Sequence, residues 1–260
     1  MSSSFDVIIV GGGLVGASLA AALGPAGVSV ALIEPRPPIP LPADATWDSR
    51  VYAISPGSAA FLEACGAWQR LPRERVTRIE TMRVYGDDLT ACLDFSAYDT
   101  GLRELAFIVE NRLLQDALWQ QLQSADYVRL FCPARCAAVA WEANAVTLRL
   151  EGGAELTAKL LVGADGADSW VRDQAGIGAV PVAYGQLGVV ANFAVAKPHR
   201  GAAYQWFRRD GVLALLPLPG ERVSMVRSTA EENARALLML TPHELAASVE
   251  AASQRALGPL

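Results

Sequence analysis

One glycine-rich turn between two apolar runs constrains the fold of this chain more than any other feature. The glycines stand at the first, third and sixth positions of the turn: Gly11, Gly13 and Gly16. An apolar run at 5–10 precedes them, and an Ala- and Leu-rich segment at 14–23 follows. A second apolar run at 28–33 then ends at Glu34. This order predicts a strand, a helix and a second strand, the βαβ unit of a parallel sheet.

Each part of this unit has a role in binding a dinucleotide. Gly11 permits the tight turn, Gly13 lets the backbone approach a pyrophosphate, and Gly16 lets the helix pack closely on the strand. The N-terminus of the helix would offer free N–H groups and a positive dipole end to the phosphates. Glu34, 18 residues after Gly16, would accept the two ribose hydroxyls of an adenosine. The strand, the helix, the second strand and the acidic residue all stand at the spacing of a dinucleotide-binding motif. This agreement predicts dinucleotide binding, but it does not distinguish FAD from NAD.

Composition and charge narrow the class of protein. Hydrophobic residues make up 52% of the 260 residues and charged residues 19%, which favours a folded chain with a sizeable core in one large or two modest domains. The net charge of −5 makes nucleic acid a poor partner. Residues 7–33 carry no charge and are long enough to span a bilayer. Their glycines and their lack of basic flanks instead favour a buried βαβ unit over a membrane span or a signal peptide.

The cysteines and histidines give no sign of a disulfide framework or a metal site. The chain has four scattered cysteines and two histidines: Cys65, Cys92, Cys132, Cys136, His199 and His243. Their spacings match neither a CxxC pair nor a zinc site. We therefore expect buried or half-buried thiols in a reducing compartment, and hence a cytoplasmic protein without a metal.

Apolar periodicity and turn residues divide the rest of the chain into further elements. Helices are expected at 56–65, 112–123, 169–175, 230–239 and 242–257. Strands are expected at 78–85, 89–95, 105–110, 189–195, 203–207, 212–216 and 222–227, and a meander of four strands at 128–131, 136–141, 146–150 and 155–162. The pattern predicts an α/β nucleotide-binding domain at 1–178, with a β-meander insertion near 127–162. A β-rich second domain at 179–260, with helices at its C-terminal end, is expected to follow.

Two further stretches are compatible with contacts to a cofactor. Asp165 and Gly166 form a turn after an apolar strand and before a helix that Ser169 would cap. This is either only a DG turn with a helix cap, or a second close approach of the backbone to a cofactor. Arg112 lies at the start of a predicted helix, and Arg50 lies in a loop directly before another. Each arginine is either solvated or directed at a pyrophosphate, whose charge and geometry suit a guanidinium.

The order of these motifs resembles one enzyme family. GGGLVG, Glu34, DSRVYAIS, ENRLLQDAL and LLVGADGADSWVR follow one another over nearly the whole chain. This order is similar to that of the class A flavin monooxygenases with the p-hydroxybenzoate hydroxylase fold, and within them to the ring hydroxylases of ubiquinone biosynthesis. The resemblance implies that the FAD pyrophosphate lies against the three glycines and Arg112, with its adenosine ribose on Glu34. It also implies that Asp165 and Gly166 are tied to FAD and transiently to NAD(P)H, and that Arg50 lies near the flavin with no firm role.

The same resemblance implies a reaction. NAD(P)H would reduce FAD, the reduced flavin would take up O₂, and a flavin C4a-hydroperoxide would hydroxylate an electron-rich aromatic ring, here a polyprenylphenol. A small hydrophobic aromatic substrate and other ubiquinone-biosynthesis proteins are then the expected partners, and a peripheral contact with the inner face of the membrane is compatible with such a substrate. A prenyl-chain reductase of the same fold and a nucleotide-binding fragment or complex subunit without turnover stay open as alternatives. The Trp-x-Trp-x-Ile-Pro motif of flavin halogenases is absent from the sequence.

The chain departs from this family in one respect. Family members carry a third fingerprint, a Gly-Asp dipeptide in an apolar context, after the DG turn. The one Gly-Asp dipeptide of this sequence, at 86–87, stands at a charged strand end and precedes that turn. We therefore expect a truncated chain or a natural fragment whose second domain is cut short. These 260 residues alone are not expected to hydroxylate a substrate.

Overall fold

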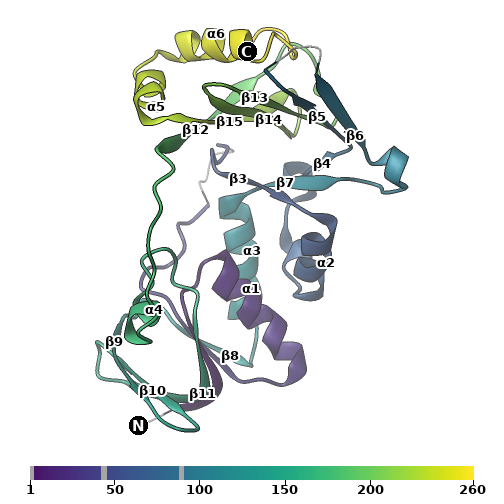
Figure 1. Ribbon diagram of the computed structural model, residues 1–260. Coiled ribbons are helices and arrows are strands. Elements are labelled where there is room, and N and C mark those ends of the chain that lie inside the picture. Colours follow the sequence, from purple (N-terminus) through teal and green to yellow (C-terminus); the bar gives the residue numbers. More distant parts are fainter. Residues whose placement is uncertain (1–2, 42–45, 88–90) are drawn as a thin grey trace. The chain divides into compact units, whose positions relative to one another are not determined.

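The computed structural model of the chain describes residues 3–41, 46–87 and 91–260 (Figure 1). The chain divides into two compact units. The first unit comprises residues 1–43, 60–71 and 112–180, and the second comprises residues 44–59, 72–111 and 181–260. The limit after residue 180 lies close to the expected domain limit after residue 178. The two units interleave along the chain, however, so that 44–59 and 72–111 belong to the second unit and not to the first.

The first unit is built on a six-stranded sheet. Its strand order is β8 (Val128–Phe131), β2 (Val30–Ile33), β1 (Ser3–Val10), β11 (Glu155–Gly163), β10 (Val146–Leu150) and β9 (Cys136–Trp141). β1 pairs in parallel with β2 on one side and with β11 on the other, and helix α1 (Leu14–Leu23) connects β1 to β2. The predicted βαβ unit is therefore confirmed. Ile8, Ile9 and Leu32 are at most 1% exposed, because both faces of a central parallel strand are covered.

The expected four-stranded meander is wrong for its first strand. β9, β10 and β11 form antiparallel pairs, but β8 pairs in parallel with β2 at the opposite edge of the sheet. Helix α3 (Asn111–Gln123) leads into β8, and a helical connection is the usual way to reach a parallel position. The unit also holds helix α4 (Trp170–Gln174) and 3₁₀ turns at Gly24–Ala26 and Trp68–Arg70.

The second unit holds another six-stranded sheet. Its strand order is β12 (Gln186–Ala194), β15 (Arg222–Ala230), β14 (Gly211–Leu218), β13 (Ala202–Arg208), β5 (Thr81–Tyr85) and β6 (Cys92–Ser96). Helices α5 (Glu231–Leu238) and α6 (Pro242–Ala252) cover one face, where Leu213, Leu215 and Met225 are buried in their core (Figure 1). β5 pairs in parallel with β13, far along the chain. This pairing explains why the segment 72–111 belongs to the second unit.

Three element limits differ from the sequence-based expectation. The strand expected at 78–85 is split into β4 (Thr77–Ile79) and β5, which belong to different sheets. The strand expected at 89–95 is found as β6, while residues 89–90 of the expected range lie outside the described residues. The helix expected to reach residue 257 ends at Ala252. Gln254 and Arg255 both have a φ of 54°, a left-handed conformation that stops the helix.

Strand β3 (Val51–Ile54) is an unexpected element. It pairs with β7 (Ala106–Glu110), which also pairs with β4, in a three-stranded sheet of the second unit. The expectation that Arg50 directly precedes a helix is therefore wrong, because β3 stands between Arg50 and helix α2 (Pro56–Ala64). A four-residue strand is defined by its partner more than by its own propensity, so the local sequence does not reveal it. Further 3₁₀ turns lie at Arg73–Arg75 and Tyr98–Thr100.

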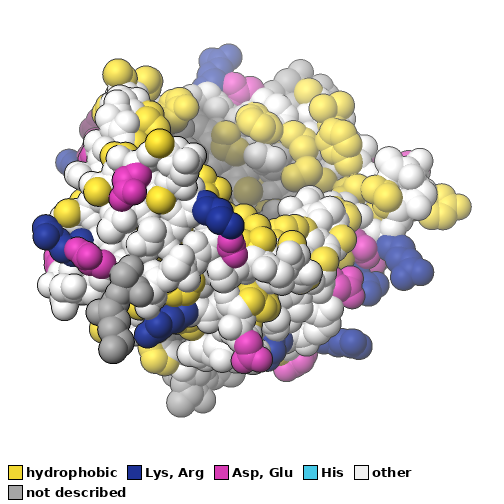
Figure 2. Space-filling model, turned by 90° about the horizontal axis from the view of Figure 1, so that it is seen from below, with side chains coloured by type: hydrophobic (Ala, Val, Ile, Leu, Met, Phe, Trp, Pro, Cys, Tyr) yellow, Lys and Arg dark blue, Asp and Glu magenta, His cyan; other side chains and the backbone are white. Residues whose placement is uncertain are grey.

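One face of the molecule carries mixed charges. Side chains of both signs are interspersed on the face that Figure 2 shows, with hydrophobic side chains between them. In the described part of the chain, no helix is both long and apolar enough to cross a membrane.

The four cysteines differ in exposure. Cys65 is buried, and Cys132 and Cys136 are half-buried. Cys92 is exposed on the edge strand β6, so the expectation of buried or half-buried thiols is wrong for this residue. Burial raises the pKa of the Cys136 thiol to about 12, with nearby carboxylates adding to the shift, and burial also raises the pKa of Cys65.

We expect a thiol reagent such as DTNB to label Cys92 first. The thiolate is the reactive form, and at about pH 8 the raised pKa values of Cys65 and Cys136 leave little thiolate at either position. Cys92 should therefore react at least about tenfold faster than Cys136 in the folded protein, followed by absorbance and by peptide mass. The Cys92→Ser variant should lack the fast phase. A fast phase of unchanged amplitude in that variant would contradict this expectation.

Candidate functional site

The turn between β1 and α1 needs glycine at two positions for reasons of packing. Gly11 has a φ of +105°, and a Cβ built on it would lie 2.3 Å from the carbonyl oxygen of Ala164. A Cβ on Gly16 would lie 1.9 Å from the carbonyl oxygen of Gly11. Real Cβ atoms do not approach backbone this closely. The tight turn at Gly11 and the close helix packing at Gly16 therefore follow the roles predicted from their spacing.

Gly13 is a glycine for a different reason. A Cβ built on it meets nothing within 4 Å, and its φ of −66° is open to any residue. Gly13 is the N-cap of α1, and no side chain accepts a hydrogen bond from the helix there. The carbonyl of Gly13 accepts the first helical hydrogen bond, from Ala17 N at 2.9 Å. The chain itself thus leaves open space over Gly13, next to an uncapped helix N-terminus. An anionic group fits that space and that dipole.

The peptide groups of Gly12 are fixed on both sides. Its N–H donates to Glu34 Oε2 at 2.7 Å, and its carbonyl accepts from Gln115 Nε2 at 2.7 Å and from Trp119 Nε1 at 2.9 Å. Gln115 and Trp119 stand one turn apart on helix α3, so this helix holds the glycine turn in place. Neither residue was predicted from the sequence. The available signal was their spacing of four residues on a predicted helix, which places two hydrogen-bond donors on one face.

Glu34 directly follows β2, and its carboxylate accepts hydrogen bonds from the backbone of the chain itself. Besides Gly12, it accepts the N–H of Arg36 through Oε1 at 3.1 Å. The carboxylate is half-buried, and an ionised carboxylate has about four acceptor sites, so further hydroxyl donors still fit. Its expected role in accepting ribose hydroxyls stays a prediction.

Replacing Glu34 by alanine is expected to weaken FAD binding by about 1.5–3 kcal/mol, the size of a lost hydrogen bond to a charged group. The variant removes the acceptor for the ribose and also frees the N–H of Gly12, which loosens the turn. A flavin fluorescence titration measures the change in dissociation constant. Glu155→Ala, at an exposed carboxylate on β11, is the matched control. A change below about tenfold in Glu34→Ala would show that this carboxylate only holds the turn.

The DG turn lies beside the glycine turn. Ala164, directly before it, donates its N–H to Val10 O at 2.7 Å, and its carbonyl limits the space at Gly11. Gly166 has a φ of +93°, which explains the glycine there without any ligand. The sequence therefore brings two tight turns to the same end of the parallel strands β1 and β11.

The Asp165 side chain is engaged within its own turn. Its Oδ1 accepts from the Ser169 hydroxyl, and its Oδ2 accepts from the N–H of Val171 at 3.1 Å. Ser169 in turn caps α4 by accepting the N–H of Arg172 at 3.0 Å, which confirms the predicted cap. In this conformation the carboxylate shapes the turn, and any contact with a cofactor stays a prediction.

Most of the predicted site residues belong to one unit. The first unit contains seven of them: Gly11, Gly13, Gly16, Glu34, Arg112, Asp165 and Gly166. Arg112 is half-buried in the first turn of α3. Arg50 belongs to the second unit, where its guanidinium lies 5.6 Å from the ring centre of Tyr52 and its carbonyl accepts the N–H of Asn111 at 2.9 Å. Within the described residues, no group of three or more His, Cys, Asp or Glu side chains is placed to hold a metal ion.

A buried ion pair supports the loop that carries Arg50. The Arg75 guanidinium binds both carboxylate oxygens of Glu110 at 2.8 Å and lies 3.9 Å from the ring centre of Trp47. Glu110 Oε2 also accepts the N–H of Asp48 at 2.7 Å, and Asp48 Oδ1 accepts the N–H of Arg50 at 3.1 Å. From the sequence, Glu110 was predicted only as part of ENRLLQDAL, because its partners come from separate segments of the chain.

The family is decided by comparison with known proteins. The sequence matches the FAD-binding domain family over residues 4–258. The chain is a member of this family. The chain is also 36% identical over 245 residues to ubiquinone hydroxylase UbiL of Rhodospirillum rubrum, and 34% identical over 244 residues to 3-demethoxyubiquinol 3-hydroxylase of Escherichia coli. Each match covers 94% of the chain, but the chain spans only 56% and 62% of the lengths of these two relatives.

Solved structures of other proteins share the fold of this chain. PqsL of Pseudomonas aeruginosa, solved in complex with 2-aminobenzoylacetate, has a TM-score of 0.79 and 25% identity, over 97% of this chain and 67% of that one. A flavin-dependent monooxygenase, PieE, solved with FAD and substrate, has a TM-score of 0.66 at 18% identity, which supports the fold alone. The predicted α/β fold with a Rossmann-like FAD-binding domain is confirmed, and so is the resemblance to FAD-binding monooxygenases and ubiquinone hydroxylases.

Proposed function

We propose that this chain is the FAD-binding part of a monooxygenase that hydroxylates an electron-rich aromatic ring, a polyprenylphenol of ubiquinone biosynthesis. The observation that carries the proposal is the difference between the three glycines. Gly11 and Gly16 are required by packing, whereas Gly13 faces open space that a ligand would fill. The backbone at Gly13 is therefore open to close contact with a ligand, and no atom of the described chain occupies that space.

The first unit has suitable groups for the adenosine and pyrophosphate half of FAD. The open backbone at Gly13 and the uncapped start of α1 suit the pyrophosphate, with the Arg112 guanidinium as a further positive group. The Glu34 carboxylate suits the ribose. Bound FAD would supply the redox and oxygen chemistry, with NAD(P)H as the reductant. The residues of the chain would bind and orient it.

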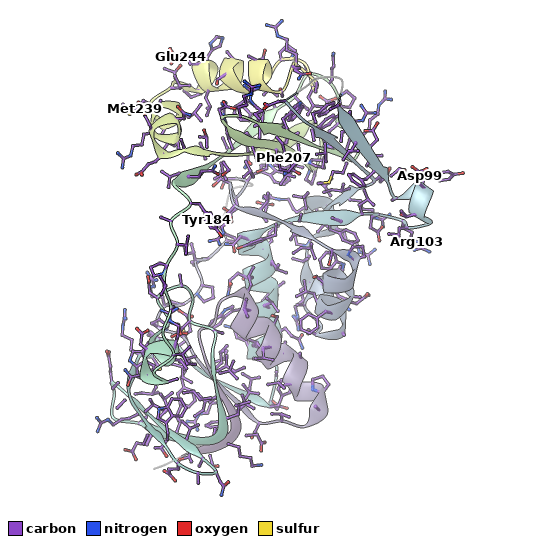
Figure 3. The ribbon with its side chains drawn as sticks, viewed as in Figure 1. Asp99, Arg103, Tyr184, Phe207, Met239 and Glu244 are labelled. Atoms are coloured by element: carbon purple, nitrogen blue, oxygen red, sulfur yellow. The ribbon has the colours of Figure 1, made fainter. Side chains whose placement is uncertain are left out.

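The second unit has an apolar sheet face that suits a hydrophobic aromatic substrate. Residues that alternate with Leu213 and Leu215 point away from α5 and α6, and the strand register extends this face across the sheet. Large side chains on it are exposed: Val190 (42%), Phe207 (50%), Leu93 (62%) and Phe95 (50%). Figure 3 shows Phe207 on this sheet. Such a surface would bind an apolar ring or chain and exclude water from it.

The proposal is tested by product analysis. The purified protein is given FAD, O₂, NADH or NADPH, and a short-chain polyprenylphenol, and the products are analysed by mass spectrometry together with peroxide. We expect the 260-residue chain to bind FAD and to yield peroxide without a hydroxylated ring, and we expect the Gly13→Val variant to lose FAD binding. One added oxygen atom in the ring is expected of the whole monooxygenase of which this chain is the FAD-binding part. A substrate that gains two hydrogens instead would identify a prenyl-chain reductase. Absence of flavin binding by the wild-type protein would contradict the proposal as a whole.

A further inference from the structure

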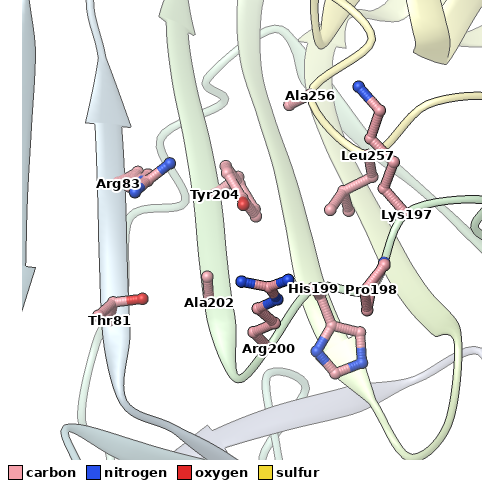
Figure 4. A pocket seen from close by; sticks show the side chains of 10 residues that line it. All are labelled: Thr81, Arg83, Lys197, Pro198, His199, Arg200, Ala202, Tyr204, Ala256 and Leu257. Atoms are coloured by element: carbon pink, nitrogen blue, oxygen red, sulfur yellow. The ribbon is translucent and has the colours of Figure 1, made fainter.

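A cationic pocket of the second unit lies outside the site described above. Its volume is about 420 Å³. Figure 4 shows the side chains that line it. It lies between the starts of β5 and β13, the loop after β12, and the segment that follows α6. Cationic and hydroxyl-bearing side chains line it together with small apolar ones, and the polar ones include Thr81, Arg83, Lys197, Arg200 and Tyr204. No carboxylate is among the lining residues, although the chain as a whole has a net charge of −5.

The cations of this pocket are available to a ligand. Among the described residues, the side chains of Lys197 and Arg200 form no hydrogen bond or ion pair. Arg83 is paired with Asp94 at 3.4 Å, but both side chains are half exposed or more, and such a surface pair is weak. Figure 4 shows the Arg83 guanidinium directed toward Tyr204, on the same side of the sheet.

The loop that carries Lys197 and Arg200 is held rigidly. The His199 ring bridges the carbonyls of Leu218 and Gly220 through Nε2, each at 2.8 Å, and its Nδ1 accepts the N–H of Gly201 at 3.2 Å. The N–H of Lys197 donates to Leu257 O at 3.0 Å. A fixed loop presents its cations without the loss of conformational freedom that a mobile one would incur on binding.

The backbone at Arg200 is strained. Its φ of 50° is left-handed, a conformation that glycine adopts freely and arginine rarely does. The neighbouring residue, Gly201, is already a glycine with a φ of 69°. Strained backbone conformations concentrate at functional sites. The conformation of Arg200, together with its unpaired side chain at a pocket, therefore indicates a role in binding a ligand.

We propose that this pocket binds a phosphate group. The two free cations supply positive charge and the hydroxyls of Thr81 and Tyr204 can donate hydrogen bonds, as a phosphate dianion requires. The apolar side chains of Pro198, Ala202 and Leu257 would face the organic part of a phosphate ester. A soluble phosphate ester and the headgroup of an anionic phospholipid share this chemistry. The proposal is independent of FAD binding, which rests on other residues.

Calorimetric titration with inorganic phosphate in a chloride buffer tests the proposal, with and without FAD. We expect saturable one-site binding in the wild type and roughly tenfold or greater weakening in both Arg200→Gly and Lys197→Gln. Arg200→Gly removes the cation and also relieves the backbone, so it should fold at least as well as the wild type. The matched control is Arg209→Gln, at a cation that is 94% exposed at the other end of β13.

Two further probes separate the sources of the phosphate. Glycerol 3-phosphate represents a soluble ester, and sedimentation with phosphatidylglycerol vesicles, against phosphatidylcholine vesicles, represents a membrane. Binding of glycerol 3-phosphate without vesicle binding would identify a soluble ligand, and Arg200-dependent sedimentation with the anionic vesicles would identify a lipid headgroup. Equal phosphate affinity in wild type and Arg200→Gly, or no binding of any probe by the wild type, would overturn the proposal.

Discussion

Replacing Gly13 by valine is expected to abolish FAD binding while lowering the free energy of unfolding by no more than about 1 kcal/mol, the cost of valine at a helix N-cap. The chain tolerates a side chain at this position, because a Cβ there meets nothing within 4 Å and the backbone is in an ordinary conformation. The valine would instead occupy the space proposed for the pyrophosphate. We expect the affinity for FAD to fall by at least about 100-fold, or roughly 2.7 kcal/mol.

Two control variants make this expectation specific. Gly178→Val also places valine at a glycine with open space and should leave FAD binding intact. Gly16→Ala should destabilise the fold itself, because its Cβ would meet the backbone of Gly11 at 1.9 Å. Flavin fluorescence and thermal unfolding, measured on all three variants, separate the two effects. Normal FAD affinity in Gly13→Val would show that the open space is not the phosphate site.

The parts of the site that depend on local spacing could be predicted from the sequence. The turn at 11–16, the acid at Glu34 and the cap at Ser169 each involve residues close in the chain, and each forms at the predicted position. Glycine spacing, strand ends and helix caps are short-range rules with few competing outcomes. The βαβ unit follows from them directly.

The parts that depend on long-range pairing could not be predicted in this way. β5 joins β13, and β8 joins the far edge of its sheet, because of partners that no local pattern identifies. The anchoring of Gly12 by Gln115 and Trp119 likewise depends on how α3 packs. Asp165 shows why functional roles are harder to predict than turns. Its turn was predicted, but the contacts of its carboxylate with Ser169 and Val171 were not.

Glu110→Ala is expected to lower the free energy of unfolding by about 3–5 kcal/mol. The Glu110 side chain is only 3% exposed and Arg75 only 19%, so the variant leaves a largely buried guanidinium without its carboxylate. It also removes the acceptor for the N–H of Asp48. Breaking a buried pair costs far more than the pair itself contributes, because the remaining charge has lost its water.

The pair of Arg78 and Glu104 is the matched control. Its atoms are 3.8 Å apart, and the side chains of Arg78 and Glu104 are 64% and 17% exposed. Because the charge that remains in Glu104→Ala is the exposed Arg78 guanidinium, which keeps its water, this variant should cost at most about 1 kcal/mol. Urea unfolding of both variants measures the two changes. The double variant Arg75→Met/Glu110→Leu should recover part of the loss, since it removes both charges together. A loss for Glu110→Ala no larger than that for Glu104→Ala would show that water reaches this pair, and that the loop carrying Arg50 is held by other contacts.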